Sequence, residues 1–528
     1  MDTKALRQKI LDLAIRGKLV PQDPNDEPAS VLLERIRDEK QQMVKDGKLK
    51  AKDIKNDTVI FKGEDNLHYE KLPDGSVKCI EDEIPFELPQ WWEWTFLSNI
   101  VCVLNGDRGQ NYPAKNKLQN EGIPFVSASN IEDGVVSADG LLCLSDAQYN
   151  ALGAGKLVSG DIVYCIRGSL GKCGLFTMEK GAIASSLVIV RSILDNTHVR
   201  DYIFLYLNSA FADEEIKKYD NGSAQPNLAA KDFTHFLVPI PPQKEMQRIN
   251  EQAQKALGYV KSIQNSKSEL CDAIAMTKSK ILDLAIRGKL VPQDPNDEPA
   301  SVLLERIRTE KEELIKQGKI KRDKRESVIF KGEDNSYYLK IGNLTETLDD
   351  WRIDDIPDSW GVCCLGEVCD YGNCTNVDTK DIPETAWILD LEDIEKDTGK
   401  VLQKLMLKER NSASTKHSFH KGQVLYSKLR PYLNKVVLAD DEGYCTSEIL
   451  PLDFNDMVYP KYARYYLMSP TFLKYANYCS YGVKMPRLGT NDGKKAILTV
   501  PPLQEQHRIV NAIETIFAKL DEIANALS

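Results

Sequence analysis

The sequence has no long apolar run, no zinc-type pair of cysteine pairs and no excess of positive charge. No window approaches the roughly 18 uncharged apolar residues that a membrane-spanning helix needs. The first stretch, MDTKALRQKILDLAIRGK, is charged from its second residue and has no apolar core, which argues against a secretory signal. We therefore expect a cytoplasmic protein without membrane association, whose twelve cysteines are reduced.

Catalytic and metal-binding motifs are missing as well. The GxxxxGK[ST] loop of a motor ATPase and the [DNS]PP[YFW] motif of an adenine methyltransferase do not occur, and GDRG at 106–109 and GSLG at 168–171 are interpreted as turns between strands. His417 and His420 have HxxH spacing without a third ligand nearby. The closest group of cysteines fits no standard zinc knuckle: Cys363, Cys364, Cys369 and Cys374. We expect no catalytic site, cofactor or metal in this chain.

The net charge of −10 argues against a protein that coats nucleic acid without regard to sequence, because such binding depends on neutralising phosphates. Any contact with DNA must therefore come from local groups of basic residues.

The sequence does contain a long duplication. Residues 9–37 and 280–308 both read KILDLAIRGKLVPQDPNDEPASVLLERIR, without one difference and 271 positions apart. Similarity continues, with two residues deleted, to VIFKGEDN at 59–66 and 328–335. A chain of 528 residues is too long for one core, and the duplication predicts two related halves. The function should therefore lie in the segments that the two copies of the repeat enclose.

Two helices are predicted within residues 1–50 from apolar residues at helical spacing, with the punctuation at Asp26 and Pro28 between them. Residues 45–82 are polar with little periodicity and are predicted to be a linker with one short strand at 59–61.

From residue 85 the pattern changes to short alternating runs such as DIVYCIRG and AIASSLVIVRSIL, which predict strands joined by turns. Residues 201–219 are predicted to form one amphipathic helix. A second module with the same frame starts near residue 356: IPDSWGVCCL matches LPQWWEWTFL at the entrance, and ILTVPPLQEQHRI matches FLVPIPPQKEMQRI at the exit. Between these anchors the modules share little, as expected if each recognises something different.

A helix with heptad spacing follows each module. The central one should be roughly 45 residues and about 65 Å long. Aligned by their apolar seams, the C-terminal and N-terminal helices together rebuild this central helix with three positions missing. We therefore expect these two helices to lie end to end and antiparallel on the central helix, in a circularly arranged, pseudo-twofold α+β protein.

The predicted domains are a helical region and linker at 1–85, a β-rich module at 86–240, a central helical region and linker at 241–355, a second β-rich module at 356–500, and a coiled-coil helix at 501–528.

The sequence resembles the specificity subunit of type I restriction-modification systems over essentially its whole length. The markers are the LAIRGKLVPQDPNDEPASVLLERI repeat, the IPxxW-type entrance, the exits PPQKEMQRI and PPLQEQHRI, and the loop GSAQPNL at 222–228. The second module departs from this pattern, because SYGVKMPRLG at 480–489 replaces the loop. Whether this loop has the same role in both halves is left open by the sequence.

The resemblance implies a non-catalytic DNA-recognition subunit with two target recognition domains, each of which reads one half of a bipartite asymmetric sequence in double-stranded DNA. It implies that the helices set the distance between the halves and dock two modification subunits, which bind S-adenosylmethionine and methylate adenine. Restriction and motor subunits would join for cleavage.

Candidate DNA contacts are basic, amide and hydroxyl side chains in predicted loops, because arginine pairs with guanine, asparagine or glutamine with adenine, and basic side chains with phosphates. In the second module residues 416–439 carry basic and no acidic side chains, interleaved with Tyr426 and Tyr432. The first-module candidates are Arg108, Gln110, Asn111, Lys115, Arg167, Ser169, Lys172, Gln225 and Asn227. The second-module candidates are Lys428, Arg430, Tyr432, Lys435, Lys484 and Arg487.

Two identical stretches, LAIRGKLVPQ at 13–22 and 284–293, are predicted to hold two copies of one partner. The candidate partner contacts are Leu13, Ile15, Arg16, Leu19, Leu284, Ile286, Arg287 and Leu290. The acidic net charge favours a rival class, a coiled-coil scaffold with two protein- or glycan-binding β domains. An enzyme with an unrecognised site would require activity from the isolated chain.

Overall fold

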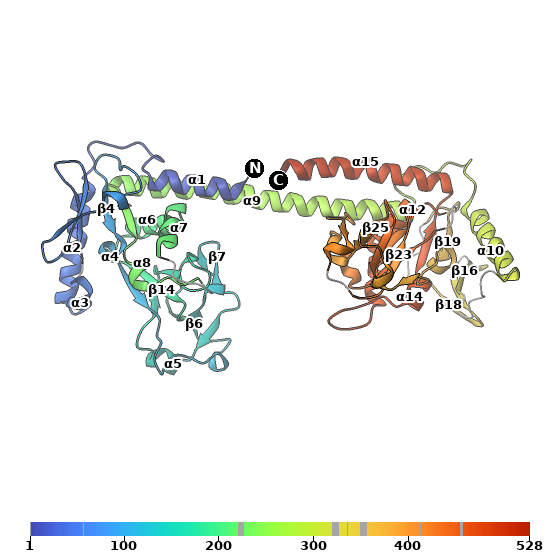
Figure 1. Cartoon of the computed structure of the whole chain (residues 1–528), viewed down its shortest axis with the longest axis horizontal. Coiled ribbons are helices and arrows are strands. Elements are labelled where there is room, and N and C mark those ends of the chain that lie inside the picture. Colours follow the sequence, from blue (N-terminus) through green and yellow to red (C-terminus); the bar gives the residue numbers. More distant parts are fainter. Residues whose placement is uncertain are drawn as a thin grey trace. The chain divides into compact units, whose positions relative to one another are not determined.

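The computed structural model describes residues 2–55, 57–219, 226–318, 327–334, 336–348, 356–410, 413–454 and 458–527. The chain divides into two compact units, Met1–Ser266 and Lys267–Ser528, and each mixes helices with strands. Helix α9 (Gln243–Ile286) is continuous through the boundary, so each unit contains part of it (Figure 1). Its 44 residues agree with the predicted length.

In the first unit, helix α1 (Thr3–Ile15) lies antiparallel beside the first part of α9 (Figure 1). The Asp2 carboxylate caps α1 by accepting from the backbone N–H groups of Lys4 and Ala5. One core joins the apolar face of α1 to that of α9 and includes Leu11, Ala14, Ile15, Met246, Ile249 and Ala253. Helices α2 (Ala29–Lys45) and α3 (Ala51–Ile54) follow.

The strand predicted at 59–61 is confirmed, but the prediction that the rest of 45–82 is a linker is wrong. Strands β1 (Val59–Lys62), β2 (His68–Lys71) and β3 (Val77–Cys79) form a three-stranded antiparallel sheet. The second unit repeats it as β16 (Ser327–Lys331), β17 (Tyr337–Ile341) and β18 (Leu344–Thr347). Strands β2 and β3 have no buried residue, so they have no apolar pattern by which a sequence could reveal them.

The first module has a six-stranded sheet, β5-β14-β11-β12-β8-β7, and a four-stranded sheet, β10-β13-β6-β9. The six strands are β5 (Val101–Asn105), β14 (Leu187–Ser192), β11 (Ile162–Cys165), β12 (Cys173–Leu175), β8 (Val135–Val136) and β7 (Ile131–Glu132). The four are β10 (Lys156–Val158), β13 (Lys180–Ile183), β6 (Ile123–Val126) and β9 (Leu142–Leu144), and the short helices are α4 (Leu97–Ile100), α5 (Asp146–Ala151) and α8 (Ala230–Phe233).

The predicted single helix at 201–219 is two helices, α6 (Thr197–Leu207) and α7 (Ala210–Tyr219). Asn208 ends α6, and the Ser209 hydroxyl accepts from the backbone N–H of Ala212 at the start of α7. The second module repeats the break between α12 (Pro460–Leu467) and α13 (Pro470–Tyr478), where Ser469 caps α13. A serine that caps a new helix therefore interrupts an apolar pattern that continues through it.

The second module has a five-stranded sheet, β20-β23-β26-β21-β22, and a three-stranded sheet, β25-β24-β27. The five strands are β20 (Asn376–Val377), β23 (Lys416–Phe419), β26 (Gly443–Thr446), β21 (Trp387–Leu389) and β22 (Leu405–Met406). The three are β25 (Val436–Leu438), β24 (Val424–Ser427) and β27 (Ile449–Leu452), and the remaining helices are α10 (Ala300–Lys316), α11 (Leu365–Val368) and α14 (Thr490–Lys495).

Each module begins and ends in one two-stranded antiparallel sheet. In the first, β4 (Glu93–Phe96) pairs with β15 (Leu237–Ile240), and in the second β19 (Gly361–Cys364) pairs with β28 (Ile497–Val500). After β28, helix α15 (Leu503–Leu527) lies antiparallel beside the second part of α9, where Lys278 forms an ion pair with Asp521. Among the described residues no helix is both long and apolar enough to cross a membrane.

Candidate nucleic-acid interface

The duplicated block builds the same joint in both units, where the end of a long helix meets the entrance and exit of a module. In the first unit the indole N–H of Trp92 donates to Glu245 at 3.1 Å, and Arg248 pairs with Asp26 at 2.6 Å. In the second unit the matching bonds are Trp360 to Glu505 at 3.0 Å and Arg508 to Asp297 at 2.6 Å. We call these two sets of residues, with Gly17 and Gly288, the joints.

A glycine turn follows helix α1 in the first joint and helix α9 in the second. Gly17 has φ +64°, and a Cβ there would lie 2.6 Å from the Pro89 ring and 2.9 Å from Trp92. Gly288 has φ +66°, and its Cβ would lie 2.4 Å from the Pro357 ring. Only glycine combines this backbone conformation with so close an approach.

Burial shifts the pKa of one glutamate in each joint. Burial raises the pKa of Glu245 to about 7, against the smaller opposing effects of the Trp92 hydrogen bond and Arg248. Burial also raises the pKa of Glu505, whose second oxygen accepts from Gln293 at 2.6 Å. The corresponding oxygen of Glu245 is buried without a partner among the described residues.

The candidate partner contacts divide into buried and accessible side chains. Ile15 and Ile286 are 1% and 4% exposed and belong to the cores of their own units, so they support the surface and are not free to contact a partner. Arg16 and Arg287 pair with aspartates one helical turn away, at 2.6 and 2.9 Å. The other four are partly exposed: Leu13, Leu19, Leu284 and Leu290.

In the first module, two segments far apart in the sequence meet beyond the end of β11. The backbone N–H of Leu228 donates to the carbonyl of Ile166 at 2.9 Å, and that of Gly168 donates to the carbonyl of Pro226 at 3.0 Å. Between these bonds the exposed Arg167 donates through Nε to Asn227 at 3.0 Å. Ser169 is exposed in the same loop, and Gln225 lies outside the described residues.

The second module has the same construction beyond the end of β24. The backbone N–H of Leu488 donates to the carbonyl of Lys428 at 3.0 Å, and that of Arg430 donates to the carbonyl of Pro486 at 2.7 Å. Residues 486–488 therefore take the place in the second module that residues 226–228 take in the first. Arg487 stands where the first module has Asn227.

The side chains on this shared backbone differ between the modules. Arg487 forms a bidentate pair with Glu448, with distances of 2.9–3.2 Å, whereas the first module has the Arg167–Asn227 bond. Around Arg487 lie the partly exposed Lys428, the exposed Lys484 and Tyr432, which is 50% exposed. The two modules thus present different hydrogen-bonding groups on a matching framework.

One lysine has the same structural role in each loop. The ammonium group of Lys172 donates to the carbonyl of Ala128 at 2.8 Å, and that of Lys435 donates to the carbonyl of Leu391 at 2.6 Å. Burial lowers the pKa of Lys435. Both lysines fasten the loop to a neighbouring short helix, and this leaves fewer of their N–H groups for a phosphate.

The early loop of the first module is joined to the same end of the module. Arg108 donates to the carbonyl of Ser185 at 3.3 Å, while the next residue, Ser186, accepts from the backbone N–H of Ile166 at 3.0 Å. Asn111 donates to the carbonyl of Ala151 at 2.8 Å. Gln110 and Lys115 are exposed.

Two residues of the predicted basic strip are core residues. Lys416 is 2% exposed and lies 3.6 Å from Asp390, and Tyr426 is 3% exposed. They are buried because nearly the whole of each strand is: all four residues of β24 and three of the four residues of β23 are buried. Sequence reasoning also missed Glu448, which holds Arg487, because a residue 39 positions away carries no local signal of this contact.

The described residues hold no group of three or more His, Cys, Asp and Glu side chains placed to bind a metal ion. The Nδ1–H of His417 donates to the carbonyl of Ile449 at 2.9 Å, and the ring of His420 lies 3.0 Å from Asp453, so the two histidines have separate partners.

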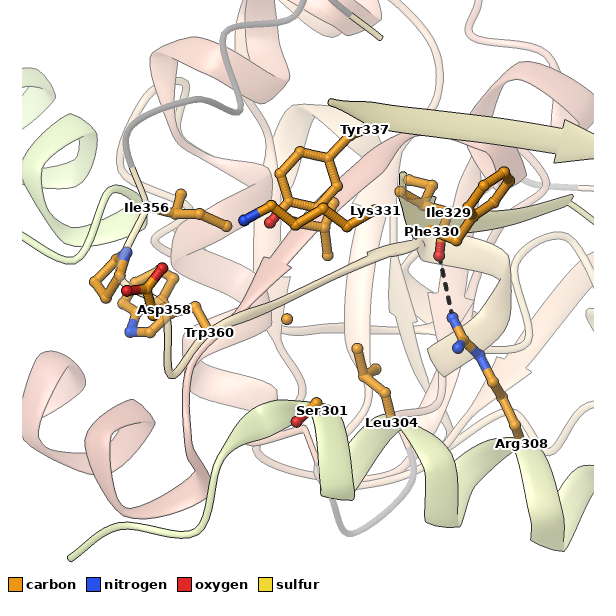
Figure 2. Close-up of a pocket in the computed structure, with 13 residues that line it drawn as sticks. Ser301, Leu304, Arg308, Ile329, Phe330, Lys331, Tyr337, Ile356, Asp358 and Trp360 are labelled. Atoms are coloured by element: carbon orange, nitrogen blue, oxygen red, sulfur yellow. Dashed lines mark hydrogen bonds between the residues drawn. The ribbon is translucent and has the colours of Figure 1, made fainter. Parts of the chain in front are cut away.

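A pocket of about 550 Å³ lies between α10, the β16–β17 hairpin and the entrance of the second module (Figure 2). In Figure 2, Lys331 extends across it toward Ile356, and Arg308 donates to the carbonyl of Ile329 at 3.5 Å. Residues 349–355, which lead into Ile356, lie outside the described residues. We assign no ligand to this pocket.

Comparison with known proteins identifies the family. The model of the type I restriction modification DNA specificity domain matches twice, at residues 89–270 and 357–528. The specificity subunit of the EcoEI type I restriction enzyme of Escherichia coli is 26% identical over 591 aligned positions, which cover 99% of this chain and 90% of that protein. The EcoAI specificity subunit of Escherichia coli is 31% identical and covers 70% of this chain, which spans 63% of that protein.

The fold has a counterpart among solved structures. A chain described under "complex assembly and conformational transition of the type I R-M system" has a TM-score of 0.50 and 17% identity, over 84% of this chain and 94% of that one. The two matched segments make up more than half of the chain and coincide with the two modules and the helices that follow them. The chain therefore belongs to the family of type I restriction modification DNA specificity proteins, with two copies of the specificity domain.

Proposed function

We propose that this chain is the non-catalytic, sequence-recognising subunit of a type I restriction-modification complex, and that each module reads one half of a bipartite asymmetric site in double-stranded DNA. The observation that carries the proposal is the pair of matching loops, fixed by the same backbone bonds and furnished with different side chains. A shared frame with different donors and acceptors is what two different half-sites require.

The proposed DNA contacts fall into base readers and phosphate contacts. Arginine and amide side chains suit base edges. Lysines can contact either a base edge or a phosphate. In the first module, which we take as 86–240, the contacts are Arg108, Gln110, Asn111, Lys115, Arg167, Ser169, Lys172, Gln225 and Asn227. In the second, taken as 356–500, they are Lys428, Arg430, Tyr432, Lys435, Lys484 and Arg487.

The long helices would form an antiparallel coiled coil that sets the spacer between the half-sites and docks two modification subunits. The length of α9 and the antiparallel course of α1 and α15 beside its two parts support this arrangement. So do the matching joints, because two equivalent surfaces bind two copies of one partner in a pseudo-twofold, circular arrangement. The modification subunits would supply S-adenosylmethionine, and restriction subunits would join the complex in the cytoplasm.

Exchange of one module tests the proposal. Residues 86–240 are replaced by the corresponding module of another specificity subunit, and the methylated sequence is determined by methylome sequencing of a host that also carries the modification subunit. We expect one half of the site to change and the other half and the spacer to stay. A change in both halves, or in neither, would contradict the assignment of one half-site to each module.

The net charge of −10 favours a second candidate, a scaffold with two protein- or glycan-binding domains. Salt dependence separates the two. A DNA-recognition subunit in complex with its modification subunit loses affinity for duplex DNA steeply as salt rises, because counterions are released on binding. A scaffold shows no such dependence.

A further inference from the structure

Arg430 has a backbone conformation that its counterpart in the first module needs a glycine to adopt. Its φ and ψ are 50° and 64°, in the left-handed region that residues with a Cβ rarely occupy. The residue in the same place in the first module, which makes the same bond to a proline carbonyl, is Gly168 with φ +81°. Arginine therefore costs conformational free energy at a position where glycine would cost none.

The neighbouring turn repeats this comparison. Asn434 has φ +49° where the first module has Gly171 with φ +78°. Asparagine tolerates the left-handed region better than most residues, because its short side chain bonds locally. Its amide N–H here makes a long-range bond, donating to the carbonyl of Met468 at 3.2 Å, while its Oδ1 is buried without a partner among the described residues. Asn434 thus has a structural reason for its place, and Arg430 needs another one.

The guanidinium group of Arg430 has no partner within the described part of the chain. The other described arginines of this module are all engaged: Arg410 with Asp390, Arg464 with the carbonyl of Thr398, and Arg487 with Glu448. For Arg430 no hydrogen bond or ion pair with a described residue is found, and its Nε is buried without an acceptor. The side chain as a whole is partly exposed, so its terminal N–H groups are accessible, while the buried Nε lacks the acceptor that a buried donor normally has.

The backbone on either side holds Arg430 in a fixed position. Its N–H donates to Pro486 at 2.7 Å, and its carbonyl accepts from Leu433 at 2.9 Å. Leu429 before it is 8% exposed, and Pro431 after it is buried. Tyr432 and Lys484, both exposed, lie on the same two loops. The guanidinium is thus carried by a rigid turn at the proposed DNA surface.

We propose that Arg430 is a specificity-determining residue that recognises the guanine of one G·C pair in the half-site read by the second module. This inference rests on the proposed function. Guanine O6 and N7 in the major groove accept two parallel N–H bonds from an arginine, which would supply the missing partners. Backbone strain held in place by rigid surroundings is typical of such sites.

The test compares Arg430→Gly with Asn434→Gly in the complex of the full chain with its modification subunit. Both substitutions restore the glycine of the first module and relieve a left-handed residue, but only the first removes the guanidinium. Binding is measured against a library of duplexes with randomised bases, and thermal unfolding is recorded for both variants. For Arg430→Gly we expect an unfolding temperature no lower than that of the wild type.

The expected result for Arg430→Gly is a loss of preference for G·C at one position of one half-site, about 10- to 100-fold in discrimination. Asn434→Gly should retain the preference at every position. Arg430→Lys should keep most of the affinity but weaken this preference, because lysine lacks the planar pair of parallel N–H donors that arginine offers to guanine. If Arg430→Gly does not fold, the base preference of Arg430→Lys still tests whether the guanidinium recognises guanine.

An unchanged base preference in Arg430→Gly or Arg430→Lys would overturn the proposal. A uniform loss of affinity over all sequences with a shallower salt dependence would overturn it too, because it would identify a phosphate contact. Neither outcome affects the proposed function, which fails separately if the wild-type complex shows no bipartite sequence preference.

Discussion

At the scale of single residues, the sequence predicts which side chains could bind DNA but not which of them are already engaged. Arg167 and Arg487 are candidates because arginine is the commonest reader of guanine. The structure shows each of them bonded within its own module, to Asn227 and Glu448, which lie 60 and 39 positions away. Such pairings depend on how strands are brought together, and no local pattern encodes them.

Glu245 makes a prediction about pH. Its pKa is raised to about 7, so between the pKa of the unfolded chain, near 4.5, and pH 7 the folded state binds more protons than the unfolded state. The free energy of unfolding therefore falls as pH rises through this window and levels off above it. Glu245→Gln removes this pH-dependent loss. From pH 5 to pH 8, the free energy of unfolding of the variant should therefore rise by about 1–3 kcal/mol relative to that of the wild type.

The measurement is urea unfolding of the wild type and the variant at several pH values. Glu505→Gln serves as the matched comparison, because Gln293 already donates to the second oxygen of Glu505. Its effect should have the same sign and a smaller size. If the free energy of unfolding depended on pH in the same way in the wild type and in Glu245→Gln, the pH dependence could not be assigned to Glu245.

At the scale of elements, long regular patterns predict the structure well and short ones do not. Helix α9 has nearly the length that its sequence predicts, because apolar residues alternate in steps of three and four along it. Of the sheet β1-β2-β3 only β1 is predicted, because these strands have three or four residues each and bury little. The helix pair α6 and α7 reads as one helix in the sequence because the apolar stripe continues across Ser209.

The glycine turns at the joints make a prediction about stability. Gly17→Ala adds a Cβ at positive φ and within 2.6 Å of the Pro89 ring, so we expect a loss of about 2–4 kcal/mol in the free energy of unfolding. Gly47→Ala is the control, because Gly47 has φ +72° and a Cβ there would have no atom within 4 Å. It should cost about 1 kcal/mol.

Denaturant unfolding of both variants measures the difference. The same comparison can be made in the second unit with Gly288→Ala and Gly318→Ala, since Gly318 also has positive φ and open space around it. If Gly17→Ala and Gly47→Ala lost equal stability, the close approach to Pro89 would not be what requires glycine at the joint.

At the scale of the whole molecule, the identity of residues 9–37 and 280–308 is enough by itself to predict two related halves. It does not reveal that residues 226–228 and 486–488 hold equivalent places, because these two segments share only the pattern Pro-x-Leu. Backbone bonds define that equivalence, and these bonds leave the side chains free to differ.

The proposed role of α9 in spacing the half-sites makes a prediction about target length. Seven residues inserted between 266 and 267 keep the heptad register and add about 10 Å of helix. At about 3.4 Å per base pair, the spacer should grow by about three base pairs with both half-sites unchanged. Methylome sequencing reports both half-sites and the spacer length. As a control, an insertion of the same length beside Gly75 should change none of these. An unchanged spacer after the α9 insertion would refute the spacing role.

The pairing of β4 with β15, and of β19 with β28, has an evolutionary consequence. Because the first and last strands of a module are hydrogen-bonded neighbours, a module leaves the helical framework and returns to it at one point. The chain between Glu93 and Ile240 and that between Gly361 and Val500 can therefore change in length and sequence without altering the path of the helices. New binding specificities can arise by exchange of whole insertions, while the assembly that uses them stays the same.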